Sequence, residues 1–484
     1  MNLYFFKEVG CLFTTTRIRR FVEWIEVCLI SRSDKWSADM MLILIIAYVI
    51  AYAIIQTNGF VIESFSWTYL LVLMPIWLID GIRWYIELRL PNAARTGSED
   101  LGKVNIIIPA HNSAGVIDNT VNSLFAKGFS ANQIVVSING ATDGGKTLKL
   151  VKNLGVRYLN NPEPIGKVRA INNALINVLS PYVLILDDDT CLLKETSIPT
   201  ELLDKGYGAV AYSVEVADRN WLTDLQAFEY RKSNAAKQAH GSSGSVQNIS
   251  GAIGLFRREV LLEQIEMHST EFPGEDLQRT LLLHLFSNTR GVALVDSKVI
   301  TEAPNSINQL WNQRVFGWWP GMYANIPNYF KLIFKKGVRR SLRLDAAYNL
   351  FAVLALDPLR ALTLPILLLY PWYFFITWGT YTILEVISWV RIGRKGPLWV
   401  VLVYPLYGLF NFLTRVCAYR VYVTRRFLVK LKRGKYPDDH VHSPWWLKLI
   451  ISPWSVIPVA LLFATNVMYN YTEYLISWSF WLGK

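Results

Sequence analysis

Residues 182–190 read YVLILDDDT, in which an apolar run is followed by three consecutive aspartates and a threonine. An apolar run without alternation is typical of a strand that is buried on both faces of a sheet. Val104–Pro109 (VNIIIP) and Gln133–Ile138 (QIVVSI) have the same character. We therefore predict that these three runs are buried, parallel strands.

Helical patterns separate the three runs. They cover Gly115–Ala126, Thr147–Leu154 and Lys167–Leu179. Alternating strands and helices indicate an α/β sheet, in which ligands bind at the carboxyl ends of the strands. We expect residues 101–305 to form this domain and the three aspartates to lie at its functional edge.

The sequence on either side of this domain is much more apolar. Hydrophobic residues make up 52% of the chain and charged residues 18%, against roughly 25% charged in soluble domains. About 20 apolar residues suffice to cross a bilayer, and five stretches approach this requirement. They are residues 38–56, 67–86, 364–390, 397–414 and 449–469.

These stretches predict the organisation of the whole chain. We expect an interfacial amphipathic segment at 1–37, a transmembrane hairpin at 38–86 and interfacial amphipathic helices at 306–345. Residues 346–484 then supply about three transmembrane helices and a basic cytoplasmic loop at 415–447. Four cysteines in 484 residues exclude a disulfide-stapled secreted scaffold.

Lysine and arginine placement predicts the orientation. Basic residues precede the first span and follow the second, whereas the loop between the two contains none. By the positive-inside rule, the α/β domain then faces the cytoplasm of a multi-pass plasma (inner) membrane protein. Counting the spans places the basic cluster at 391–395 on the side opposite the α/β domain, as an exception to the positive-inside rule. Orientation and anionic lipid account for much of the net charge of +12, so nucleic-acid binding is not required.

Gly140–Thr147 (GATDGGKT) matches the phosphate-binding pattern G-x-x-x-x-G-K-[ST] between a predicted strand and a predicted helix. This match suggests one alternative function, a membrane transporter driven by nucleotide hydrolysis. That interpretation leaves the chain's other motifs unexplained.

Six motifs occur in a fixed order. They are IIIPAHN (106–112), NGATDG (139–144), GKVRAINN (166–173), DDDT (187–190), GAIGLFRRE (251–259) and GED (274–276). Together with the flanking spans, they resemble the family 2 glycosyltransferases, specifically the membrane-embedded cellulose, hyaluronan and poly-N-acetylglucosamine synthases.

This resemblance implies a GT-A-like (Rossmann-like) nucleotide-sugar transferase domain inserted in an α-helical transmembrane bundle. It implies inverting transfer from a nucleoside-diphosphate sugar to a growing β-linked polysaccharide, coupled to export and compatible with accessory export subunits. Transfer of a single sugar to a lipid-phosphate carrier is the alternative enzymatic function.

The resemblance also assigns roles to the acidic residues. Asp187 and Asp189 form a D-x-D pattern that implies a Mg²⁺ or Mn²⁺ site. Adjacent carboxylates repel one another unless a cation lies between them, which also favours a metal ion here. Asp187 and Asp188 are expected to contact the nucleotide. Asp276 takes the position of the base that removes the acceptor proton, and Glu275 beside it is expected to serve the acceptor and pyrophosphate.

Further donor-binding residues are implied around the strand ends. We expect a UDP-sugar rather than a GDP-sugar, although Ile138-Asn139 replaces an acidic pair that is usual in the family. The expected donor-binding residues are Pro109, Ala110, His111, Asn112, Asn139, Asp143 and Lys167.

The acceptor motif departs from the family pattern. Processive members carry Q-x-x-R-W, whereas residues 313–319 read QRVFGWW. Gly317 stands where the arginine would be, and the spacing is one residue longer. We expect Gln313 and Arg314 to serve the acceptor and pyrophosphate, and Trp318 or Trp319 to stack on the acceptor sugar.

Overall fold

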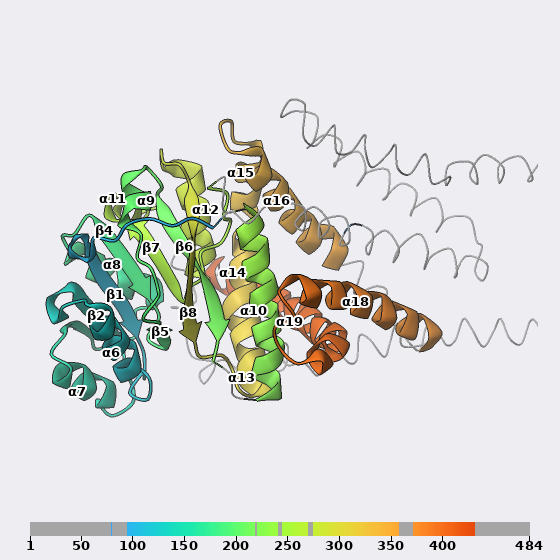
Figure 1. Cartoon of the computed structure of the whole chain (residues 1–484), viewed down its shortest axis with the longest axis horizontal. Helices are drawn as coiled ribbons and strands as arrows, with labels where there is room; N and C mark the ends of the chain where they lie inside the picture. Colours follow the sequence, from blue (N-terminus) through green and yellow to red (C-terminus); the bar gives the residue numbers. More distant parts are fainter. Residues whose placement is uncertain are drawn as a thin grey trace, which may run out of the picture. The chain divides into compact units, whose positions relative to one another are not determined.

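The computed structural model describes residues 94–217, 220–240, 244–269, 274–357 and 371–430, together with residue 79. Eight strands within these ranges form one mixed sheet in the order β3-β2-β1-β4-β7-β6-β8-β5 (Figure 1). Their bounds are β1 Val104–Ala110, β2 Ile134–Asn139, β3 Arg157–Asn161, β4 Tyr182–Leu186, β5 Thr190–Leu192, β6 Ala209–Val216, β7 Ile253–Arg257 and β8 Val292–Thr301.

The three apolar runs form adjacent parallel strands, as predicted. β1 pairs in parallel with β2 and β4, and its Ile106 lies opposite both Ile134 and Leu184. The second half of the sheet is different, because β7 runs antiparallel to β4 and β6. The observed sheet is therefore mixed, with a parallel half that includes the acidic strand end.

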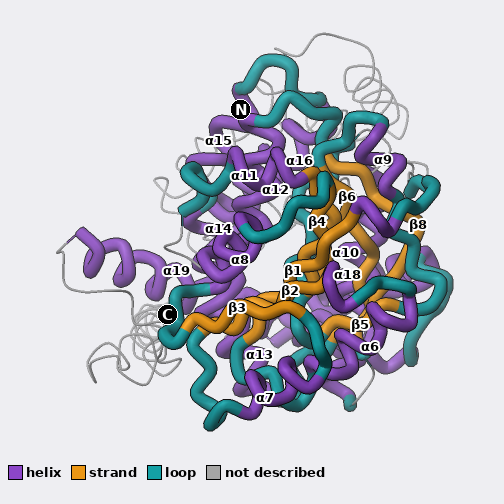
Figure 2. The backbone as a smooth tube through the Cα atoms, turned by 90° about the vertical axis from the view of Figure 1, so that its left-hand side faces the viewer, coloured by secondary structure: helices purple, strands orange, loops and turns teal. Residues whose placement is uncertain are grey.

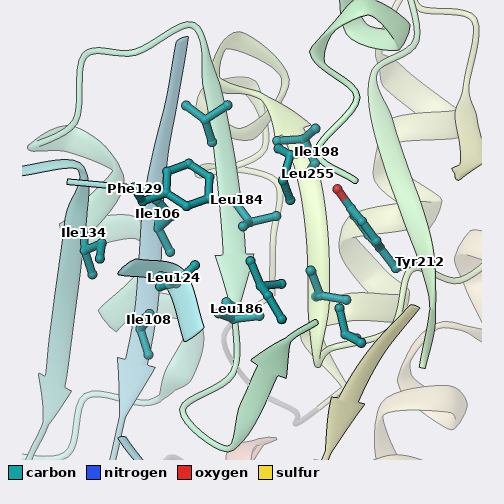
Figure 3. Close-up of a cluster of buried hydrophobic side chains, with 14 of the residues drawn as sticks. Ile106, Ile108, Leu124, Phe129, Ile134, Leu184, Leu186, Ile198, Tyr212 and Leu255 are labelled. Carbon is teal, nitrogen blue, oxygen red and sulfur yellow. The ribbon is translucent and has the colours of Figure 1, made fainter. Parts of the chain in front are cut away.

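Helices cover both faces of the parallel half (Figure 2). They are α6 (Ile117–Lys127), α7 (Lys146–Asn153) and α8 (Lys167–Ile176), each close to its predicted range. Ile106 and Leu184 pack with Leu124 of α6 on one face (Figure 3). Ile107 packs with residues of α8 on the other. Double-sided burial explains why these strands are apolar at most positions, with Asn105 and Ser137 as the buried polar exceptions.

The remaining helices carry the rest of the functional segments. They are α9 (Thr200–Asp204), α10 (Trp221–His240), α11 (Arg258–Glu263), α12 (Glu275–Phe286), α13 (Ile307–Asn312), α14 (Trp319–Ala324), α15 (Ile326–Phe334) and α16 (Arg340–Phe351). Two further segments are π-helices, η5 (Gln313–Trp318) and η6 (Ala352–Leu356). Two long helices follow, α18 (Pro371–Arg391) and α19 (Leu398–Lys430).

One helix in the described part of the chain is long and apolar enough to cross a membrane, at Leu398–Val423 within α19. It extends well beyond the predicted span 397–414. The predicted segment 1–37 and the spans 38–56 and 449–469 lie outside the described residues, as does 67–86 except for residue 79.

The loop between α18 and α19 corrects one prediction. Counting spans placed its basic cluster on the side opposite the α/β domain. Instead, Lys395 lies within electrostatic reach of Lys298 and Glu215, on β8 and β6. A Cβ atom on Gly396 would lie 3.0 Å from Arg231 Nη1 of α10. The loop therefore lies against the α/β domain.

Candidate active site

The carboxyl ends of β1, β2 and β4 bring the predicted polar residues to one edge of the sheet. His111 and Asn112 follow β1, Asn139 ends β2, and Asp187 follows β4. This convergence follows directly from the parallel pairing of the strands.

Lys167 joins two carboxylates from distant parts of the chain. It is the first residue of α8, and its Nζ lies 2.7 Å from Asp187 Oδ1 and 2.7 Å from Glu275 Oε1. Burial alone would lower the pKa of Lys167, but the two carboxylates hold it well above its ordinary value. Lys167 is therefore a fixed positive charge that links the end of β4 to the start of α12.

The two acids respond differently to this lysine. Burial would raise the pKa of Glu275, yet Lys167 holds it below the usual value. Burial raises the pKa of Asp187 to about 7, and the nearby charges of Asp189 and Glu275 add to the rise although Lys167 opposes it. One lysine thus leaves the carboxylate cluster under-neutralised.

Asp276 lies in the first turn of α12, held by backbone amides. Its Oδ2 accepts a hydrogen bond from the Gly251 amide at 3.0 Å, and its Oδ1 accepts one from the Leu277 amide at 2.8 Å. Burial raises the pKa of Asp276 to about 6, with the adjacent Glu275 charge adding to the rise. A carboxylate with this pKa is ionised at neutral pH and is a better proton acceptor than an ordinary aspartate.

Asp188 and Asp189 are oriented by hydroxyl groups. The Ser113 hydroxyl donates to Asp188 Oδ2. The hydroxyls of Thr301 and Thr190 donate to Asp189 Oδ1 at 3.1 and 3.3 Å. Burial raises the pKa of Asp189, and the charge of Asp188 adds to the rise. Thr301, at the end of β8, was not identified from the sequence.

The donor set suits a cation that is shared with a ligand. Among the described residues, no group of three or more His, Cys, Asp or Glu side chains could hold a metal ion alone. Mg²⁺ is usually bound by one or two carboxylates together with substrate phosphates. The under-neutralised Asp187 and Asp189 fit that pattern.

The loops after β1 and β2 hold each other in place. His111 Nδ1 lies 2.7 Å from the Asn139 carbonyl oxygen, and Asn112 exchanges hydrogen bonds with Thr142. Asn139 Oδ1 accepts from the Ile165 amide at 2.8 Å. Pro109 and Ala110 are buried within β1, so His111 and Asn112 form the accessible part of the predicted donor loop.

Gly140–Thr147 does not present the amides that phosphate would need. Asp143 follows β2, and its carboxylate accepts from the amides of Gly145 and Thr147 at 3.1 and 2.8 Å. A phosphate-binding loop directs such amides at its anion. Lys146 is exposed at the start of α7. This geometry counts against the hydrolysis-driven transporter.

The segment QRVFGWW lies beside the start of α12. A Cβ atom on Gly274 would lie 3.2 Å from Gly321 Cα and 3.7 Å from the Trp318 carbonyl oxygen. Trp318 is 38% exposed. The Trp319 indole instead donates to Thr414 Oγ1 of α19 at 3.0 Å. Of the two tryptophans, Trp318 is therefore the better placed for a ligand.

Arg314 does not face the carboxylate cluster. It is fully buried, and its Nη2 lies 2.5 Å from Glu229 Oε2 of α10. Its guanidinium lies over the Trp318 ring, 3.6 Å from the centroid. Gln313 Oε1 is buried and makes no hydrogen bond within the described residues. The placement of Arg314 does not suit the expected pyrophosphate contact.

Helix α10 contributes residues that sequence reasoning missed. Glu229 and Tyr230 contact Arg314 and Trp318, respectively. Lys237 lies near Asp276; burial lowers the pKa of Lys237 to about 8 although Asp276 opposes the shift. No motif marked these residues, because their roles depend on tertiary contacts with α12 and η5.

Comparisons with known proteins find similar sequences and structures. Residues 105–264 match the family model described as Glycosyl transferase family 2. A poly-β-1,6-N-acetyl-D-glucosamine synthase from Staphylococcus aureus (strain MSSA476) is 23% identical over 253 residues, covering 49% of this chain and 60% of that protein. The synthase of the same name from Staphylococcus epidermidis is 20% identical over 275 residues, covering 52% and 64%. The matched region thus spans less than two thirds of each relative.

Among solved structures, a mannosyltransferase from Pyrobaculum calidifontis, in complex with GDP-Man and Mn²⁺, aligns with a TM-score of 0.47 at 15% identity. The alignment covers 75% of this chain and 96% of that one.

Proposed function

We propose that this chain, which carries a family 2 glycosyltransferase domain, elongates a β-linked polysaccharide by inverting transfer from a nucleoside-diphosphate sugar. The observation that carries the proposal is the half-buried Asp276 carboxylate beside the Lys167, Asp187 and Glu275 cluster. One side of this arrangement suits proton removal, and the other suits a departing diphosphate.

In the proposed reaction, the acceptor hydroxyl oxygen attacks the anomeric carbon of the donor as the bond from that carbon to the diphosphate oxygen breaks. Asp276 takes the hydroxyl proton, and the electron pair of the broken bond leaves with the diphosphate. The amides of Gly251 and Leu277 hold the Asp276 carboxylate in place during this transfer. Attack from the face opposite the leaving group inverts the anomeric configuration.

We propose that Asp187 and Asp189 hold Mg²⁺ or Mn²⁺ together with the donor diphosphate, and that Asp188, Glu275, His111 and Asn112 complete the donor site. The ion would neutralise the charge that develops on the leaving group. Lys167 holds Asp187 and Glu275 on one side of the site. Lys167 and the metal ion would therefore together neutralise the carboxylate cluster.

The relatives suggest the first donor and acceptor to test. Both are named as synthases of poly-β-1,6-N-acetyl-D-glucosamine, so we propose UDP-GlcNAc as donor and a β-1,6-linked N-acetylglucosamine oligomer as acceptor. Export through a membrane bundle, with the catalytic domain cytoplasmic and accessory export subunits attached, belongs to the same proposal. A single-sugar product that extracts into organic solvent would instead identify the lipid-phosphate acceptor.

Asp276→Asn tests the base. Asparagine preserves the shape of the side chain but accepts no proton, so kcat should fall by at least about 100-fold. Turnover is measured as UDP release and polymer formation in purified membranes, and UDP binding by calorimetry should stay near the wild-type value. Asp296→Asn, at an exposed position on β8, is the control and should keep full turnover. Normal turnover in Asp276→Asn would reject the assignment.

Removal of divalent ions tests the metal site. A chelator should abolish turnover in wild-type membranes, and added Mg²⁺ or Mn²⁺ should restore it. Asp189→Asn should require a higher concentration of the ion because one carboxylate ligand is lost. Turnover that persists in the chelator would rule out the metal site. It would not affect the assignment of Asp276 as the base, which the Asp276→Asn variant tests separately.

A further inference from the structure

The extra residue in the acceptor motif coincides with a π-helix. Gln313 and Trp318 are five positions apart, whereas glutamine and tryptophan in Q-x-x-R-W are four apart. Residues 313–318 form η5, and a π-helix bonds residue i to i+5 instead of i+4. The wider turn absorbs the insertion and keeps Gln313 and Trp318 one helical turn apart.

The π-helix also places Arg314 against Trp318. The guanidinium lies 3.6 Å from the centroid of the indole ring and covers one face of it. Two of its nitrogens, Nε and Nη1, are buried without a hydrogen bond among the described residues. Stacking is therefore a main contact of this side chain, alongside its ion pair with Glu229.

Glu229 fixes the arginine from α10. Its Oε2 lies 2.5 Å from Arg314 Nη2 and also accepts from the Tyr407 hydroxyl at 2.8 Å. Because the Glu229 carboxylate neutralises the buried Arg314 guanidinium, little positive charge remains there to attract a diphosphate. A planar guanidinium suits this combination of ion pairing and stacking better than a lysine ammonium.

The stacked tryptophan belongs to the wall of the active site. The Trp318 and Tyr230 ring centroids are 6.3 Å apart. Burial raises the pKa of the Tyr230 hydroxyl. Arg314 opposes this rise, whereas the charges of Glu229, Asp189 and Asp276 add to it, so Tyr230 lies near both the Glu229–Arg314 pair and the two site carboxylates. The backbone of Trp318 also borders Gly274, the residue before α12.

We infer that Arg314 is a positioning residue, which holds Trp318 as the platform for the acceptor sugar and does not contact the donor diphosphate. This inference rests on the proposed function. The family motif has an arginine at the position of Gly317, and in this chain the corresponding charge, on Arg314, positions the tryptophan instead of binding the diphosphate. The Glu229–Arg314 pair fixes the indole from behind, and the exposed part of the ring remains available to a sugar.

Kinetics that separate acceptor from donor test this inference. Arg314→Lys keeps the charge but loses the flat face, and Glu229→Gln with Arg314→Gln removes both charges without leaving one unpaired. In each variant the KM for the β-1,6-linked N-acetylglucosamine oligomer should rise about tenfold, as expected for loss of a desolvated cation–π contact. The KM for UDP-GlcNAc should not change.

The control is a second ion pair on the same helix. Lys232 Nζ of α10 lies 2.6 Å from Glu385 Oε2 of α18. The rings that it contacts in the described part of the chain are those of Phe228 and Tyr404, not Trp318. Lys232→Met with Glu385→Gln should leave the acceptor KM at its wild-type value, which excludes a general effect of loosening α10.

Two results would overturn the inference. A rise in the donor KM in Arg314→Lys would show that Arg314 meets the diphosphate, and an unchanged acceptor KM would show that it does not position Trp318. A wild-type enzyme that transfers from no nucleotide sugar would reject the proposed function and this inference with it.

Discussion

At the scale of single residues, the carboxylates of the candidate site are neutralised unequally by the nearby lysines. Lys167 contacts Asp187 and Glu275, whereas Asp276 receives only amide hydrogen bonds and the more distant charges of Lys167 and Lys237. The adjacent acids Glu275 and Asp276 therefore have pKa values shifted in opposite directions. Such a difference allows one carboxylate to anchor the site and its neighbour to accept a proton.

The pH dependence of transfer should report Asp276. Its pKa is raised to about 6, and the base must be deprotonated, so kcat/KM should fall about tenfold per pH unit below that value. Lys237→Met should move this acidic limb to higher pH, because the lysine charge favours the ionised carboxylate. The measurement is a pH–rate profile of both forms. A limb that stays in place or moves to lower pH would contradict the assignment.

Sequence alone identified part of this site. The acidic cluster was predictable because parallel strands end at the same edge, and the structure places Asp187 and Asn139 there. The contacts of Arg314 were not predictable, because its partner Glu229 lies 85 positions away on α10. No local pattern distinguishes an arginine that meets a ligand from one that pairs with a distant acid.

At the scale of elements, helix periodicity located the cores of the helices but not their ends or irregularities. The predicted span 397–414 is the first half of α19, which continues to Lys430. The π-helix at Gln313–Trp318 was visible only as a motif that was one residue too long. Insertions of this kind become interpretable once the backbone shows how the turn accommodates them.

The turn after β2 gives a stability prediction. Gly140 has φ +58°, and a Cβ atom there would lie 2.2 Å from the Pro164 backbone nitrogen. Gly140→Ala should lower the free energy of unfolding by about 3 kcal/mol or more, combining left-handed strain with overpacking. Gly144→Ala is the matched control: φ is +69° but nothing lies within 4 Å, so about 1–2 kcal/mol is expected. Thermal unfolding of the purified variants should give a clearly lower Tm for Gly140→Ala, and equal Tm values would contradict the steric argument.

At the scale of the whole described region, an ion pair connects the α/β domain to α18 and a hydrogen bond connects it to α19. Lys232 of α10 pairs with Glu385 of α18, and Tyr407 of α19 joins the Glu229–Arg314 pair. Breaking a buried pair by removing one partner is costly, because it leaves an uncompensated charge. The Tyr407 hydrogen bond links the Glu229–Arg314 pair, on which Trp318 stacks, to α19, whereas the Lys232–Glu385 pair joins α10 to α18 at a separate place.

The contacts of the α18–α19 loop explain why its side relative to the α/β domain was predicted incorrectly. The positive-inside rule was applied after counting spans along the chain, and one miscounted crossing reverses the side of each later loop. In the structure, Lys395 lies near Lys298 and Glu215 of the sheet. On the predicted cytoplasmic orientation of the α/β domain, the basic cluster at 391–395 would need no exception to the rule.

Labelling from the two sides of the membrane tests this placement. Lys395→Cys should react with a membrane-impermeant maleimide from the same side as Lys194→Cys, an exposed position in the α/β domain. Both should be protected in intact cells and accessible in inverted vesicles if the α/β domain faces the cytoplasm. The unmodified chain, with its four native cysteines, gives the background. Because the loop contacts β6 and β8, opposite accessibility of the two positions would be incompatible with the described packing of α18 and α19 on the α/β domain.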